Sequence, residues 1–457
     1  MKKFLFLSAI LIAVFMSSCS SDGYKSYVPA DSKVVAKFDL ATFFSQTGVD
    51  QEKLFKDLGE KLGDDFKELK DLGIDFTSPI YIFARKNGGN IEGGAVVKVQ
   101  DRAQFEKAFE SKTDEKLSKA QDYSFLANNG VSLAVNDDVI VFVTSSDLGN
   151  GKVDKNVIDR LMNKKIEGDL GSNKVFAKAD GSNSFASFCA DMSIIPDIDL
   201  PPEAAGLGAK DLEQVRSMVI DIDASAKDGV CDFMLNTTSN DQEMQEKIDK
   251  TSKAYGFISD KAFGSFSAND LGGFVMNTDG ARLMEVVKEA IAKFTGSNPQ
   301  MAQMVGPYLE KASGIISKIK GNVLGVVHSP DDFVFLAEGK NITNDVVNLL
   351  NESGGGMMGG QQLMSTGDGY CLNGMLYFGY SGNSFYVTAN QAAAAQPAKA
   401  MGDPAPAALT NLMKGRKMVL FANVGQMRGF AQMVGANDLN AFSEVFDKIK
   451  YVTISSK

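Results

Sequence analysis

A single histidine limits the catalytic and metal sites that this 457-residue chain can build. Because His328 stands alone, any zinc site that needs two histidines is excluded. A Ser-His-acid triad through His328 stays open, since such triads are recognised by geometry and not by sequence position. His328 ends an apolar run and precedes Ser329 and Pro330, which favours a structural histidine at a turn.

Alternating acids near the middle of the chain resemble a calcium-binding loop but depart from it. Asp221, Asp223 and Ser225 have the right spacing, yet Ala226 stands where that loop needs glycine. Their period of two instead predicts the solvent-facing side of a strand. The sequence contains no complete phosphate-binding or dinucleotide-binding loop, so we expect no cofactor and no metal.

The overall charge excludes one class of partner. The chain has 47 basic and 57 acidic residues, a formal charge of −10, whereas an electrostatic nucleic-acid binder needs a net basic face. Tryptophan is absent, which counts against stacking on sugars. A pair of carboxylates for glycoside hydrolysis stays open, because separation in space is invisible in a sequence.

Three cysteines lie beyond the N-terminal region, and in an oxidising compartment they permit one disulfide and one free thiol. We favour Cys189 with Cys231, since both lie on apolar strand-like runs of one segment. The alternative is that Cys189, Cys231 and Cys371 are buried free thiols that pack as small hydrophobic residues.

The N-terminus has the three-part layout of a secretory signal peptide over residues 1–18. Lys2 and Lys3 precede an apolar run over 4–15, which is too short to span a bilayer. Ser17 and Ser18 directly before Cys19 resemble a bacterial lipobox, although Met16 replaces the usual leucine. The resemblance implies that lipid on Cys19 attaches the protein to a membrane, with residues 19–30 as a tether.

The residue after the lipidated cysteine indicates which membrane the lipoprotein reaches. Ser20 is not the aspartate that, in lipoproteins of this kind, favours retention in the inner membrane. The resemblance therefore points to the outer membrane. Whether the protein faces the periplasm or the cell surface stays open, since Asp22 alone is a weak signal for surface export.

The order of predicted elements repeats along the chain. In the first half, we expect strands at 33–39, 79–85, 94–99, 123–127, 131–135, 139–144, 184–192, 217–226 and 230–236. In the second half, strands are expected at 273–277, 315–327, 332–338, 370–372, 375–379, 384–388, 418–424 and 451–455. Helices are expected at 40–72 and 101–109, and again at 278–294 and 341–350. The sequence thus predicts two related halves, 31–262 and a truncated 263–457.

These elements predict an α+β fold. The order strand-helix-strand-strand-helix-strand is that of the split βαβ motif, so we expect duplicated βαββαβ-like units. Amphipathic strands favour mostly antiparallel sheets with one solvated face, and helices packed on the other face.

The segment after the tether resembles a known family. Tyr27-Val28-Pro29-Ala30-Asp31-Ser32, leading into Val34-Val35-Ala36-Lys37-Phe38-Asp39-Leu40, is similar to the lipoprotein family called domain of unknown function 4836, which occurs mainly in gut Bacteroidota. The likeness extends over most of the mature chain in length and element order. It implies a compartment and an overall design but no activity, because that family has none assigned.

These observations favour a non-enzymatic binding or scaffolding protein of the cell envelope, whose partner is an unknown envelope protein or polymer. The alternative is a polymer-degrading hydrolase that uses carboxylates or His328. A third possibility is an assembly factor that binds partners along an exposed sheet edge.

Overall fold

The computed structural model describes residues 22–54, 56, 72–113, 115–128, 131–145, 155–163, 168–196, 209–297, 299–353, 362–367, 369–400, 402–433 and 443–457. The signal peptide expected over 1–18 and the lipid-attachment residue Cys19 lie outside these residues, so both stay predictions. In the described part of the chain, no helix is both long and apolar enough to cross a membrane.

The chain divides into two compact units. Unit 1 comprises residues 1–199, 209–240 and 437–449, and unit 2 comprises 200–208, 241–436 and 450–457. The boundary predicted between 262 and 263 therefore falls inside unit 2. Both predicted halves contain segments of the other unit: 31–262 includes residues 200–208 and 241–262 of unit 2, and 263–457 includes residues 437–449 of unit 1.

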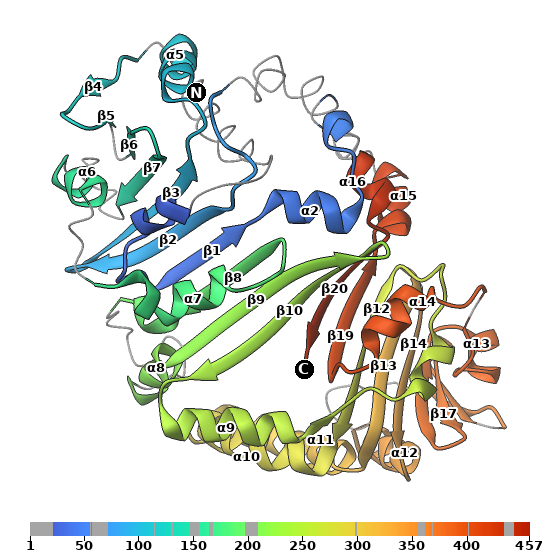
Figure 1. Ribbon diagram of the computed structural model, residues 1–457. Coiled ribbons are helices and arrows are strands. Elements are labelled where there is room, and N and C mark those ends of the chain that lie inside the picture. Colours follow the sequence, from blue (N-terminus) through green and yellow to red (C-terminus); the bar gives the residue numbers. More distant parts are fainter. Residues whose placement is uncertain are drawn as a thin grey trace. The chain divides into compact units, whose positions relative to one another are not determined.

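Unit 1 is built on one run of neighbouring strands (Figure 1). In spatial order they are β4 (Ser118–Lys119), β5 (Ser124–Asn128), β6 (Val131–Val135), β7 (Val139–Ser145), β3 (Asn90–Lys98), β2 (Ile80–Asn87), β1 (Val34–Phe38), β8 (Ala186–Asp191), β9 (Met218–Lys227) and β10 (Val230–Ser239). Its helices are η1 (Asp22–Tyr27), α2 (Leu40–Thr47), α5 (Arg102–Thr113), α6 (Lys155–Met162), η3 (Leu170–Ser172), α7 (Lys174–Asp180), η4 (Met192–Ile194), α8 (Ala209–Arg216) and α16 (Ser443–Lys448).

Helices cover both faces of the unit 1 sheet, so the prediction that they pack on one face is wrong. Val139 and Val141 of β7 belong to a core that includes residues of η1, α6 and α7. Ile140 and Phe142 of the same strand belong to a second core that includes residues of α2 and α5. Neighbouring residues of a strand point to opposite faces, so β7 is buried on both sides. Its unbroken apolar run is the sequence signature of such a strand.

Unit 2 repeats the same pairing order. Its strands are β15 (Leu363–Ser365), β16 (Gly369–Leu372), β17 (Leu376–Ser381), β18 (Ser384–Thr388), β14 (Asp332–Gly339), β13 (Ile319–Ser329), β12 (Gly272–Asp279), β19 (Met418–Asn423) and β20 (Tyr451–Ser456), with the short β11 (Tyr255–Gly256) also on β12. Its helices are α9 (Gln242–Lys253), η5 (Asp260–Ser265), α10 (Gly280–Ser297), α11 (Pro299–Ile316), α12 (Ile342–Ser353), α13 (Gln391–Ala395), α14 (Ala407–Met413) and α15 (Val424–Met433).

The α+β class with mostly antiparallel sheets is confirmed, since every strand pair with a described register is antiparallel. The pairing differs from a split βαβ motif, in which another strand separates the first two. Here β1 pairs directly with β2, and β12 pairs directly with β13. The helical segment that follows the first strand in each unit, which in unit 2 comprises α10 and α11, therefore lies between two antiparallel neighbours in the chain.

The expected tether is much shorter than predicted. Residues 22–27 form η1, and Tyr24, Tyr27 and Val28 are buried in the unit 1 core. Tyr24 donates a hydrogen bond from its hydroxyl to the Pro79 carbonyl, and Asn136 Nδ2 donates to the Tyr27 hydroxyl. The prediction of a tether over 19–30 is therefore wrong from Asp22 onward, because apolar burial holds this segment on the body.

Candidate functional site

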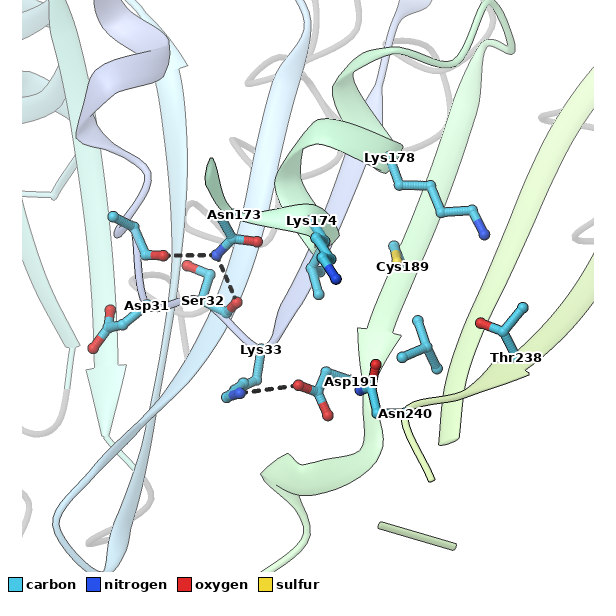
Figure 2. Close-up of a pocket in the computed structure, with 13 residues that line it drawn as sticks. Asp31, Ser32, Lys33, Asn173, Lys174, Lys178, Cys189, Asp191, Thr238 and Asn240 are labelled. Carbon is cyan, nitrogen blue, oxygen red and sulfur yellow. Dashed lines mark hydrogen bonds and ion pairs between the residues drawn. The ribbon is translucent and has the colours of Figure 1, made fainter. Parts of the chain in front are cut away.

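A pocket of about 550 Å³ lies in unit 1, between α7 and the ends of β8, β9 and β10 (Figure 2). Residues 30–33, directly before β1, form another wall. This volume is within the range of small-molecule sites in proteins. Nine of the thirteen lining residues are polar, although the surface that the lining presents to the pocket is more apolar than polar: Asp31, Ser32, Lys33, Asn173, Lys174, Lys178, Asp191, Thr238 and Asn240, with Ala30, Val175, Cys189 and Val219.

One asparagine fixes the wall nearest the helix. Asn173 is the N-cap of α7, and its side-chain oxygen accepts a hydrogen bond from the Phe176 N–H at 2.9 Å. Its Nδ2 donates to the carbonyls of Ala30 (2.8 Å) and Ser32 (2.9 Å), as Figure 2 shows. Asn173 thereby joins the start of α7 to the segment that leads into β1. Both polar atoms of its side chain take part in these hydrogen bonds.

Both carboxylates of the pocket are paired with cations. Lys33 Nζ lies 2.9 Å from Asp191 Oδ2, and Arg85 Nη1 lies 3.0 Å from Asp31 Oδ2. Burial alone would raise the pKa of Asp191, but hydrogen bonds from Lys33 and from the Ser193 N–H hold that pKa below its usual value. Asp191 is thus an ionised structural partner, whereas a glycosidase acid needs a carboxyl with a raised pKa.

The lysines of α7 differ in their partners. Lys178 forms an ion pair with the buried Asp221 of β9, which also accepts a hydrogen bond from Asn236 Nδ2 at 3.3 Å. Lys174, by contrast, is exposed and has no acidic partner within the described part of the chain. An incoming anion at this rim would meet Lys174 without first breaking an ion pair.

Cys189 lies in the wall of the pocket but is chemically inert. Its side chain is buried, and burial raises the pKa of the thiol to about 11. At neutral pH it is therefore protonated, and a thiol in this state is a poor nucleophile. Burial likewise raises the pKa of Cys231 to about 11.

The predicted disulfide between Cys189 and Cys231 is wrong, since neither of them forms a disulfide, and Cys371 forms none either. Strand β9 lies between the two cysteines, with Cys189 opposite Asp221 and Cys231 opposite Ala226. Directly opposed residues share a face, and positions 221 and 226 lie on opposite faces of β9. The two thiols therefore point to opposite sides of the sheet, which no disulfide geometry allows.

His328, the only histidine, lies in unit 2 and is not part of this pocket. Its Nδ1 lies 2.7 Å from Oδ1 of the fully buried Asp270, and this hydrogen bond raises the pKa of His328. The other Asp270 oxygen accepts from the Ser267 N–H at 2.6 Å. No described hydroxyl or thiol bonds to the second ring nitrogen of His328, so a nucleophile is missing from the triad considered above.

The acids Asp221 and Asp223 do lie on a strand, β9, as their period predicted. They are not simply solvated, however, since Asp221 bonds Lys178 and Asp223 accepts a hydrogen bond from the Ser182 hydroxyl at 2.6 Å. Over the described residues, no group of three or more His, Cys, Asp or Glu side chains is placed to hold a metal ion.

The chain belongs to the family described as domain of unknown function (DUF4836), whose model matches residues 24–457. No curated protein matches the sequence. Among solved structures, crystal form I of TP0453 matches at 12% identity over 45% of this chain and 73% of that chain, with a TM-score of 0.24. Crystal form III of TP0453 matches at 9% identity over 80% and 91%, with a TM-score of 0.22. Scores this low carry no functional argument.

Proposed function

We propose that this family member is an outer-membrane lipoprotein that binds a polar, anionic ligand without converting it chemically. The observation that carries the proposal is the unit 1 pocket, where both carboxylates are ion-paired and the thiol is protonated, while Lys174 has no acidic partner among the described residues. Such a site offers hydrogen bonds and one available cation but no nucleophile, general acid or general base.

The ligand class follows from the lining. Ser32, Thr238 and Asn240 supply donors and acceptors suited to hydroxyl groups, and Lys174 suits a carboxylate. Acidic sugars at the end of an envelope polymer combine both features.

The binding test uses galacturonic acid as the probe and neutral galactose as its matched control, with titration calorimetry. We expect galacturonic acid to bind more tightly, and Lys174→Met to remove most of that difference, roughly tenfold in affinity. Lys250→Met, an exposed lysine change in unit 2, should leave both affinities unchanged. Equal binding of the two sugars, or an unaltered difference in Lys174→Met, would contradict the proposal.

The membrane anchor is supported by the positive start, the apolar run and the position of Cys19. We expect Cys19→Ala to move the protein from the membrane pellet to the soluble fraction, because the variant has no thiol at residue 19 to carry lipid. Fractionation of cells and immunoblotting would measure this. Retention of Cys19→Ala in the pellet would overturn the anchor. In a separate experiment, protease treatment of intact cells would show whether the parent protein faces the periplasm or the cell surface.

A polymer-degrading hydrolase is the second candidate, and the His328–Asp270 hydrogen bond is the observation in its favour. Such an enzyme would also need a nucleophile or an activated water at the second ring nitrogen of His328. A structure with substrate bound beside that nitrogen would discriminate between the two candidates.

A further inference from the structure

The start of β12 in unit 2 corresponds to the start of β1 in unit 1, because the same backbone hydrogen bonds surround both. The Lys33 N–H bonds to β2, and the Lys33 carbonyl accepts from the Asp191 N–H of β8. The Leu271 N–H likewise bonds to β13, and the Leu271 carbonyl accepts from the Asn423 N–H of β19. Leu271 therefore matches Lys33, and Asn423 matches Asp191.

The next strand of each sheet carries a small residue in unit 1 and a large one in unit 2 at matching positions. Val219 of β9 is directly opposite Asp191, and Tyr451 of β20 is directly opposite Asn423. Opposed residues share a face, so Val219 and Tyr451 point to the same side of their respective sheets. Val219 lines the unit 1 pocket, whereas Tyr451 is buried, with 4% of its surface exposed.

In unit 2, the tyrosine ring spans the space that corresponds to the pocket. The Tyr451 hydroxyl lies 3.4 Å from the carbonyl oxygen of Ala268. Ala30 is the counterpart of Ala268, since each stands three residues before the matched strand start, in a turn closed by a backbone hydrogen bond. Ala30 and Val219 both line the pocket. Unit 1 therefore has open space where unit 2 has the ring of Tyr451.

The two alanine carbonyls also differ by one hydrogen-bond donor. The Ala268 oxygen accepts from Asn423 Nδ2 at 2.9 Å and from the Tyr451 hydroxyl. Among the described residues, the Ala30 oxygen accepts only from Asn173 Nδ2, at 2.8 Å. A carbonyl oxygen has two lone pairs. The second lone pair of Ala30 is thus available to a hydroxyl group of a ligand.

We infer that the ligand of the unit 1 pocket places a hydroxylated six-membered ring over Val219, with one ring hydroxyl donating to the Ala30 carbonyl. The ring of Tyr451 is the internal counterpart of this ligand in unit 2. The inference rests on the proposed function and deepens it, because it states what the ligand carries besides the negative charge that Lys174 would bind.

The lining suits such a ring. Val175, Cys189 and Val219 give the pocket apolar surface that can contact the faces of a ring, while its polar residues can meet hydroxyl groups at the ring edge. The saturated ring of an acidic sugar and the aromatic ring of a phenolic acid share this chemistry. The test therefore includes both, as galacturonic acid and 4-hydroxybenzoate.

The first arm closes the pocket from within. We expect Val219→Tyr to weaken the binding of galacturonic acid roughly tenfold or more in titration calorimetry, because the added ring would take the place of the ligand. Ile220→Tyr is the matched control, since Ile220 is the next residue of β9 and points to the opposite face. It should bind like the parent. Circular dichroism would establish that both variants are folded.

The second arm tests the hydroxyl groups at constant charge. Each ring is compared with an analogue that keeps the carboxylate and lacks the hydroxyl groups: benzoate for 4-hydroxybenzoate, and tetrahydropyran-2-carboxylate for galacturonic acid. We expect the hydroxylated member of at least one pair to bind roughly fivefold more tightly than its analogue. The pair that shows this preference identifies the ring as saturated or aromatic.

Three outcomes would overturn the inference: unchanged affinity for galacturonic acid in Val219→Tyr, equal affinities within both pairs, or binding of neither hydroxylated ring to the parent. The proposed function fails on a different result, namely no preference for the acidic over the neutral sugar, or a preference that Lys174→Met leaves unaltered. Because all four compounds of the second arm are anionic, their comparison does not depend on that preference.

Discussion

At the scale of single residues, the protonation of His328 links the stability of unit 2 to pH. The Asp270 hydrogen bond raises the pKa of His328 above its usual value, so the folded state binds a proton that the unfolded state releases more readily. The resulting stabilisation is fully present below the unfolded pKa of about 6.5 and is lost as pH rises through the raised folded value.

We therefore expect His328→Gln to lower the free energy of unfolding more at about pH 5.5 than at about pH 8.5. Urea denaturation of the parent and the variant at both pH values would measure the difference. A loss that is the same at the two pH values would show that packing of the ring, and not its charge, accounts for the effect.

The residues of the unit 1 pocket were not found from the sequence. They come from four separate stretches, at 30–33, 173–178, 189–191 and 219–240, and no local spacing connects them. Cys189 and the segment Ala30-Asp31-Ser32 drew attention only for a disulfide and a family resemblance, and Asp221, which holds Lys178 beside the pocket, only for its spacing. Asn173 was not singled out, and its bonds to Ala30 and Ser32 depend on tertiary contacts alone.

At the scale of elements, one glycine shows how closely the side chains of β12 and β13 are packed. A Cβ added to Gly325 would overlap the ring of Phe274 on the neighbouring strand. We expect Gly325→Ala to cost about 1–3 kcal/mol of stability, and Phe274→Leu to recover part of that cost in the double variant.

Urea denaturation of the single and double variants would measure this coupling. Gly264→Ala is the matched control, since an added Cβ there meets no atom within 4 Å. If Gly325→Ala unfolded at the same urea concentration as the parent, the ring would not lie over the glycine.

Strand positions were predictable because alternation and turn residues are local signals. Which strands are neighbours, and which face of each strand is buried, was less predictable. The unbroken apolar run of β7 indicated burial on both sides, yet the fold expected from element order placed helices on one face only. The cysteine pair failed for a related reason: both residues were assigned to strands correctly, but a pairing also requires adjacent strands and a shared face.

At the scale of the whole molecule, the two units share one order of strand pairing. Each strand from β1 to β9 in unit 1 has a counterpart in unit 2, and among the described strands β10 has none. We propose that the chain arose by duplication of one unit, with the second copy truncated. A row of directly opposed uncharged residues also recurs at corresponding strands, as descent from a single ancestral sheet would leave it: Ile82, Ala36, Phe188 and Ile222 in unit 1, and Gly325, Phe274, Leu420 and Ile454 in unit 2.

The short 3₁₀ helix at the start of the body would limit how far the protein stands from a membrane under the proposed lipid anchor. If lipid is attached at Cys19, only three residue steps separate it from Asp22, where η1 begins. A fully extended chain covers about 3.5 Å per residue, so the leash is about 10 Å long. A body held that closely would search only a narrow layer of the envelope beside the bilayer. Under the proposed function, a ligand borne on a long polymer would then have to present an end within that layer.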